Sequence, residues 1–136
     1  MYNSPNAQRI QELAREDGRY APAAFHFIEE AITETVKLIK NGKISSSENA
    51  PSRSGNFHVS AQELMNGVVY LARDRWGMLG GLVLEHWGVR RSEDFGEIVF
   101  LMVMDPDIGW GRRENDQKED FANTIDFSTA FDPWID

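Results

Sequence analysis

The chain has 136 residues, 41% of them hydrophobic, and these include eight Phe and four Trp. This length and composition predict that residues 1–136 fold as a single domain, and they argue against wholesale disorder. The absence of cysteine excludes disulfides and thiolate metal sites. Acidic residues outnumber basic ones by 22 to 14, which disfavours binding through phosphate contacts.

No stretch of the sequence has the roughly 18 consecutive apolar residues that a membrane span requires. The longest apolar run covers only residues 98–104. The first five residues also lack the charged start and apolar stretch of a signal peptide. The sequence therefore predicts a cytoplasmic protein that does not enter the membrane.

The first part of the chain predicts two helices. Ser4-Pro5 suits a helix start and Gly18 a helix end, which predicts a short helix with a thin apolar stripe. A longer helix is predicted from Pro22 to Asn41, closed by Gly42, because apolar residues at spacings of three and four form one face. That face consists of Phe25, Ile28, Ile32, Val36 and Ile39.

A change of composition separates these helices from the next one. Residues 43–56 contain five serines and no periodicity, which predicts a flexible Ser-rich loop. A third helix is predicted from Ser60 to Gly77, because Glu63 completes a capping box three residues after the serine. Gly67 costs about 1 kcal/mol relative to alanine inside a helix, so its presence predicts that another helix approaches closely there.

Two shorter helices are predicted next. One ends at Gly88 and takes its apolar side chains from Leu79, Leu82, Val83 and Trp87. The other begins at Ser92 with acidic residues in its first turn, where they interact favourably with the helix dipole. It ends before Asp105-Pro106, because the residue that precedes a proline is restricted to extended conformations.

The end of the sequence is rich in turn residues and then in acidic and aromatic ones. A β-hairpin is predicted from Trp110 to Phe121. Residues 114–136 form an acidic, aromatic C-terminal segment, which either folds back onto the core or, if it is exposed, contacts a partner. The candidate partner-binding residues are Trp110, Phe127, Phe131 and Trp134.

Taken together, these elements predict a mainly α fold of the α+β class. It is a compact helical domain of about five helices with a C-terminal β-hairpin. The last three helices and the hairpin follow one another in the order of a winged-helix-like domain.

Several segments, spread over nearly the whole chain, occur in the same order in one family of proteins. They are Asp17-Gly18-Arg19-Tyr20, Ala24-Phe25, His58-Val59-Ser60, Gln62-Glu63-Leu64, Gly67, Trp87-Gly88-Val89-Arg90, Asp94-Phe95-Gly96-Glu97-Ile98-Val99-Phe100, Glu119-Asp120-Phe121, Asp126-Phe127 and Ala130-Phe131. On these segments the sequence resembles the uncharacterised "Minf" family of small bacterial proteins, found mainly in planctomycetes and verrucomicrobia. The resemblance implies one structural unit and no known activity, because that family is defined by relatedness alone.

Histidines are the natural candidates for acid–base or metal chemistry, and the chain has three: His26, His58 and His86. No two of them have the close spacing of paired metal ligands on one helix. His58 precedes the Ser60 cap, which favours a local structural role. The acidic pairs are typical of solvated helix faces, and motifs for a nucleophile or a phosphate-binding loop are missing. The sequence thus predicts no catalytic residue, metal or cofactor; an acid–base or metal-dependent enzyme using His58, His86 and nearby carboxylates is the second alternative.

Two arginine pairs support the first alternative, a nucleic-acid-binding winged-helix-like domain. Its candidate residues are Arg90 and Arg91 before the last helix, and Arg112 and Arg113 in the wing. Acidic residues at the start of that helix would face phosphates, which makes nucleic acid a disfavoured partner. The leading prediction is a non-enzymatic protein-interaction or regulatory module, whose partner is an unidentified protein or a second copy of the chain.

Overall fold

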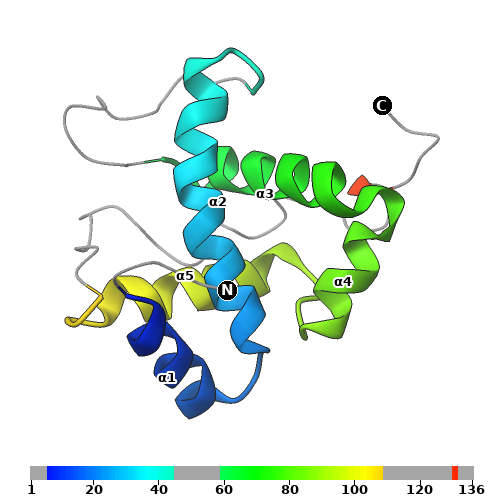
Figure 1. The fold of residues 1–136 in the computed structure, drawn as a ribbon. Helices are drawn as coiled ribbons and strands as arrows, with labels where there is room; N and C mark the ends of the chain where they lie inside the picture. The colour runs from blue at the N-terminus through cyan, green and yellow to red at the C-terminus, as the bar shows by residue number, and fades with distance from the viewer. Residues whose placement is uncertain (1–5, 45–58, 109–129, 132–136) are drawn as a thin grey trace.

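The structure is a computed structural model that describes residues 6–44, 59–108 and 130–131. In these ranges the fold is mainly helical, as predicted (Figure 1). The α-helices are α1 (Ala7–Asp17), α2 (Pro22–Lys40), α3 (Ala61–Trp76), α4 (Gly80–His86) and α5 (Ser92–Met104), and a single 3₁₀ turn, η1 (Gly77–Leu79), joins α3 to α4. No helix in the described part of the chain is both long and apolar enough to span a membrane.

Some of the predicted elements lie outside the residues that the structure describes. The β-hairpin predicted from Trp110 to Phe121 lies outside the described residues, and so does all of the Ser-rich loop after residue 44. Of the acidic, aromatic C-terminal segment, only residues 130–131 are described. The described ranges contain no strand, so the mainly α part of the prediction is confirmed, whereas the hairpin stays a prediction.

Local hydrogen bonds set the helix ends. The Ser60 hydroxyl accepts a hydrogen bond from the Glu63 N–H (3.1 Å), and the Glu63 carboxylate accepts one from the Ser60 N–H (2.9 Å), which confirms the capping box. Gly18 ends α1 in the left-handed conformation, with φ of 76°. The start of α1 differs from the prediction. Asn6 occupies the N-cap position, and its side chain donates to the Ile108 carbonyl (3.1 Å), so a contact with the chain after α5 holds this end.

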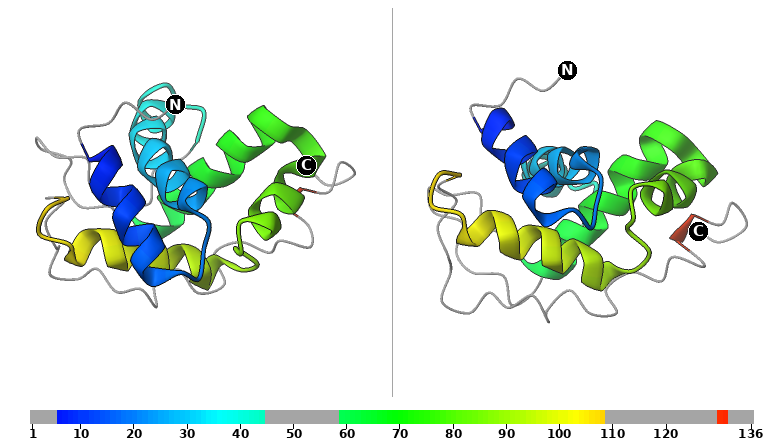
Figure 2. Two further views of the ribbon diagram at one scale, coloured as in Figure 1. Left: turned by 60° about the horizontal axis from the view of Figure 1, so that its bottom comes forward. Right: turned by 90° about the horizontal axis from the view of Figure 1, so that it is seen from below.

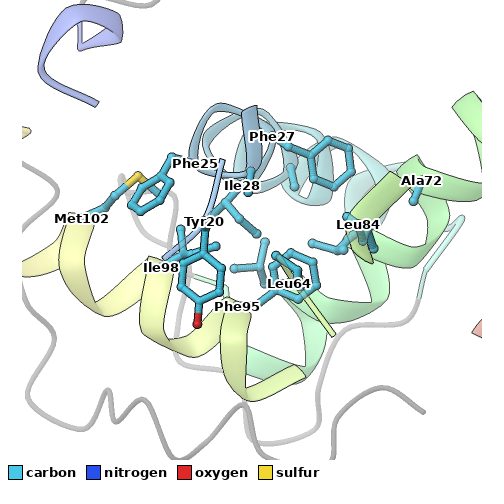
Figure 3. Packing of buried hydrophobic residues seen from close by; sticks show 14 of the residues in the cluster. Tyr20, Phe25, Phe27, Ile28, Leu64, Ala72, Leu84, Phe95, Ile98 and Met102 are labelled. Atoms are coloured by element: carbon cyan, nitrogen blue, oxygen red, sulfur yellow. The ribbon is translucent and has the colours of Figure 1, made fainter. Parts of the chain in front are cut away.

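The core lies where α2 crosses α3 and α5, with α1 and α4 at its two sides (Figures 1 and 2). Side chains from these helices meet in one buried cluster (Figure 3). Its fully or nearly fully buried members include Phe25, Ile28, Leu64, Val68, Leu84, Phe95, Ile98 and Met102. This burial of large apolar side chains is the main source of the stability of the fold.

The crossing of α2 over α3 depends on Gly67. A Cβ atom at this position would lie 2.9 Å from the Thr35 Cβ, closer than side chains can approach. The Thr35 hydroxyl is buried and donates to the Ala31 carbonyl (2.6 Å), so it needs no partner from α3. The close helix approach that Gly67 predicted is therefore confirmed.

Candidate functional site

Small residues and one aromatic ring fix the orientation of α4. Gly77, with φ of 57°, turns the chain out of α3. A Cβ atom at Gly80 would lie 2.8 Å from the Phe131 ring, and one at Gly81 would lie 3.2 Å from it, so the ring packs directly on the α4 backbone. Leu84 is fully buried on the adjoining face. One side of α4 is thus held against the protein, and its other side faces outward.

The outward side of η1 and α4 carries large apolar side chains. Met78, Leu79 and Leu82 are 60%, 56% and 63% exposed, and we call these three residues the α4 stripe. Met78 and Leu79 belong to η1 and Leu82 to the first turn of α4, so the three exposed side chains follow one another within a short stretch of chain. Contiguous exposed apolar side chains are typical of interaction sites, whereas single ones are common on any surface.

A cluster of aromatic rings lies where the last residue of α3, the residue that follows α4 and the first half of α2 meet. The Trp76 and Trp87 ring centroids are 5.5 Å apart in an edge-to-face arrangement, and the Phe27 ring lies 5.4 Å from the first and 5.7 Å from the second. Phe27 is buried, whereas both tryptophans are half-buried. Helical spacing places half-buried Val83 about 40° around the helix from Leu79, whereas Trp87 lies about 140° from Leu82. The two tryptophans pack against the buried core, and Val83 lies between Trp87 and the stripe around the helix.

Charged side chains border this apolar surface. Arg75, at the end of α3, forms an ion pair with Glu30 of α2, and its guanidinium lies 5.8 Å from the Phe27 ring centroid. Glu85 and His86 are exposed at the end of α4. An apolar centre that contains Trp and Met, with Arg and other charges at the rim, is the arrangement of many protein–protein interfaces.

The corner at the other end of α4 is polar. The Tyr20 hydroxyl donates to one Asp94 oxygen (2.8 Å), and the second Asp94 oxygen accepts hydrogen bonds from the N–H groups of Arg90 (2.9 Å) and Arg91 (3.2 Å). Burial, together with the neighbouring carboxylate, raises the pKa of Tyr20 well above its ordinary value. The Tyr20 hydroxyl therefore stays protonated and serves as a donor.

Gly88 allows the two turns of this polar corner to meet. Its φ is 94°, and a Cβ atom there would lie 2.9 Å from the Arg19 carbonyl oxygen. The Ala21 N–H donates to the Trp87 carbonyl (3.0 Å), and Arg19 forms an ion pair with Glu97 (3.2 Å). Because these groups bond to one another, we interpret the corner as a structural joint between the α1–α2 and α4–α5 turns.

The histidines considered from the sequence lie in different surroundings. His26 is buried on α2, where its Nε2 lies 3.0 Å from the Gln11 side-chain oxygen, and burial lowers its pKa. His86 is exposed in the last turn of α4, and His58 lies outside the described residues. In the described ranges, no group of three His, Asp or Glu side chains is placed to hold a metal ion.

The remaining candidate residues are only partly described. Arg90 and Arg91 are exposed in the turn before α5, and Arg112 and Arg113 lie outside the described residues. The Phe131 ring is 7% exposed against α4, which favours the folded-back interpretation for this residue. The other partner-binding candidates, Trp110, Phe127 and Trp134, lie outside the described residues.

Sequence reasoning missed the α4 stripe as a surface. The sequence pattern groups Leu79 and Leu82 with Val83 and Trp87 as the apolar side of one short helix, and it predicts no role for Met78. The signal was present in Gly80-Gly81, because small residues allow a close approach on their own side and leave the bulky ones on the opposite side.

Comparison with known proteins adds no functional assignment. No family model matches the chain, and no curated protein or solved structure matches it either. The inference of function therefore starts from the α4 stripe and its surroundings.

Proposed function

We propose that the protein is a non-enzymatic interaction module that binds a protein partner through the α4 stripe. The observation that carries this proposal is the exposure of Met78 and Leu79 in η1 and of Leu82 in α4, each by more than half, while Leu84 of α4 is fully buried. Removing apolar surface from water is favourable by roughly 25 cal/mol per Å². A partner that covers the stripe gains this free energy without disturbing the core.

The residue types of the surface support the same proposal. Tryptophan and arginine dominate binding energy at protein interfaces, and methionine adapts its shape to different partners. Here Trp76 precedes Met78 by two residues and its ring contacts Trp87, and Arg75 is held by its ion pair with Glu30 near Phe27 of the same aromatic cluster. A preorganised arginine loses less side-chain entropy when a partner binds.

The family of the protein and its cellular location are also proposals. The sequence segments quoted above, which occur along the chain in the same order as in the uncharacterised "Minf" family of bacterial proteins, support membership of that family. The chain would then act as a single cytoplasmic domain. The polar corner supports it indirectly, since segments 17–20, 87–90 and 94–97 meet there. The C-terminal hairpin belongs to this proposal as a prediction for Trp110 to Phe121, and so does the winged-helix-like arrangement of α3, α4 and α5 with that hairpin.

The nucleic-acid alternative meets an electrostatic obstacle at the start of α5. The N–H groups of Arg90 and Arg91 are engaged by the Asp94 carboxylate, and Glu93 and Glu97 lie in the same two turns. A phosphate that approached the two guanidinium groups would therefore meet several carboxylates. This charge arrangement favours the protein-interaction proposal.

Affinity capture with matched variants tests the proposal. Wild-type protein, Leu82→Glu and Met104→Glu are immobilised and exposed to native extract from the source cells. Met104 is a suitable control because it is 48% exposed and is the last residue of α5. The C-terminal end of α5 lies on the opposite side of the molecule from α4 (Figures 1 and 2). We expect a partner that wild type and Met104→Glu retain and Leu82→Glu loses, with the loss reproduced by calorimetry on the purified pair. Equal retention by all three proteins would exclude the α4 stripe as the binding site.

A further inference from the structure

We propose that the partner of the α4 stripe is a second copy of the chain, which packs its own α4 stripe against the first around a two-fold axis. This inference rests on the proposed function, because it names the partner of the same surface. It predicts a homodimer that forms in purified protein, without any component of an extract.

The stripe lies where a second molecule can reach it. Figures 1 and 2 show α4 at one edge of the fold, with α1 towards the other edge. Met78, Leu79 and Leu82 are more than half exposed there. In a two-fold dimer both copies use the same surface, so a single contact removes both stripes from water at once.

The charges around the stripe are balanced, unlike those of the whole chain. Residues 73–86 contain two basic side chains, Arg73 and Arg75, and two acidic ones, Asp74 and Glu85. With histidine counted as neutral, this stretch has no formal charge, so the excess of -8 lies entirely outside it. A partner with a strong charge of either sign gains no net attraction from such a surface, whereas two identical copies meet there without net repulsion.

The two signs of charge lie at opposite ends of the stripe. The last turn of α3, directly before the stripe, carries two arginines and one aspartate, and Glu85 follows the stripe near the end of α4. Arg75 pairs with Glu30 of its own copy, so Arg73, which is exposed, is the arginine that can turn towards a second copy. A two-fold axis perpendicular to α4 makes the two copies of α4 antiparallel, and Arg73 of each copy then faces Glu85 of the other.

A contact centred on the stripe reaches both of these charged side chains. Stable interfaces bury about 800 Å² on each partner, which corresponds to a disc of about 16 Å radius. Arg73 precedes Met78 by five residues, about 8 Å along a helix, and Glu85 follows Leu82 by three residues, about 5 Å. An interface of ordinary size therefore has the apolar stripe at its centre and the charged side chains at its rim.

The net charge of the chain predicts how the association depends on salt. Two molecules of formal charge -8 repel each other, and salt screens this repulsion while the apolar contact persists. We expect the association constant to rise about threefold between about 0.05 M and 0.5 M salt, because the Debye length falls below about 5 Å.

Sedimentation equilibrium of the purified chain tests the inference with the variants Leu82→Glu and Met104→Glu. We expect wild type and Met104→Glu to dimerise with equal affinity. Leu82→Glu should dimerise about a hundredfold more weakly, because each dimer receives two carboxylates in its apolar contact. Urea titration at a concentration at which wild type is monomeric checks that Leu82→Glu is folded.

A charge swap tests the antiparallel arrangement. Arg73→Glu and Glu85→Lys change the net charge in opposite directions, yet each should weaken the dimer about fivefold, because the pair occurs twice in each dimer. The double variant has the net charge of wild type and should regain its affinity. If Glu85→Lys dimerises as tightly as wild type, or the double variant does not recover, the two side chains do not face each other and the arrangement is refuted.

A wild type that stays monomeric even at about 1 mM protein would overturn the inference. A dimer that Leu82→Glu leaves unchanged would do the same, because another surface would then form it. Association that weakens as salt rises would contradict an apolar contact between two acidic chains. If wild type is monomeric but captures another protein through Leu82, the inference fails and the proposed function stands; if it captures nothing, both fail.

Discussion

α4 joins two corners of the molecule that are built from different side chains. At its C-terminal end, Asp94 accepts hydrogen bonds from the Tyr20 hydroxyl and from two backbone N–H groups, and Gly88 lets the turns approach. At its N-terminal end, the α4 stripe leaves large apolar side chains exposed. In the first corner polar groups satisfy one another, so its residues hold the fold. In the second corner apolar groups face water, so its residues are available for binding.

The largest loss of stability among the predicted variants is expected for Gly88→Ala, which lies in the polar corner. The new Cβ atom would meet the Arg19 carbonyl oxygen at 2.9 Å while the backbone is at positive φ, so we expect a loss of about 3 kcal/mol in the free energy of unfolding. Urea titration measures this loss. Gly42→Ala is the control: its φ is 72° but no atom is within 4 Å, so it should cost only about 1 kcal/mol. Equal losses in the two variants would show that crowding at the polar corner contributes nothing.

A smaller loss is expected for Asp94→Ala, because it leaves the Tyr20 hydroxyl and the N–H groups of Arg90 and Arg91 without their acceptor. We expect a loss of about 2 kcal/mol in thermal or chemical unfolding. Tyr20→Phe removes a single hydrogen bond of the same network and should cost about 1 kcal/mol. If Asp94→Ala unfolds at the same denaturant concentration as wild type, the polar corner is not a structural joint.

The partly buried contact between α1 and α2 at His26 and Gln11 should also make stability depend on pH. Because burial lowers the pKa of His26 in the folded state, the unfolded state binds the proton more readily. Stability from this residue is thus complete above the unfolded pKa of about 6.5 and is lost as the pH falls through the lower folded-state pKa. We expect His26→Gln, which keeps a polar side chain near Gln11, to weaken this pH dependence in urea titrations between about pH 7 and pH 5. If the free energy of unfolding of His26→Gln changes with pH as steeply as that of wild type, another group causes the pH dependence.

The smallest effect on stability is expected at the α4 stripe itself. Leu82 is 63% exposed, so Leu82→Glu should change the free energy of unfolding by less than about 0.5 kcal/mol. The same variant is expected to lose the captured partner, so binding and stability would be affected independently. A loss of stability as large as that of Asp94→Ala would mean that the stripe belongs to the core, which would remove the contrast between the two corners.

Local signals in the sequence determined where several helices begin and end. The capping box of Ser60 and Glu63 and the left-handed Gly18 depend on atoms within a few residues. These two helix ends can therefore be predicted from the neighbouring sequence. The extent of α2 could also be predicted from its repeating apolar residues, but the predicted face was only partly right. Ala31, Thr35 and Leu38 are buried, whereas Ile32, Val36 and Ile39 are half-buried. Gly67 indicated a close helix approach, and only the fold identified Thr35 as its neighbour.

Tertiary contacts decided what the sequence left open at both ends of α4. α4 is seven residues long and has apolar side chains around most of its circumference, so periodicity does not distinguish an inner from an outer side. Phe131, about 50 positions later in the chain, packs on the Gly80-Gly81 side and thereby turns the stripe outward. Asp94 likewise suited a helix dipole by sequence alone, yet its hydrogen bond to Tyr20 joins residues 74 positions apart. Helix ends follow from neighbours in sequence, whereas the choice of an exposed side follows from packing between distant segments, because burial depends on what approaches from elsewhere in the chain.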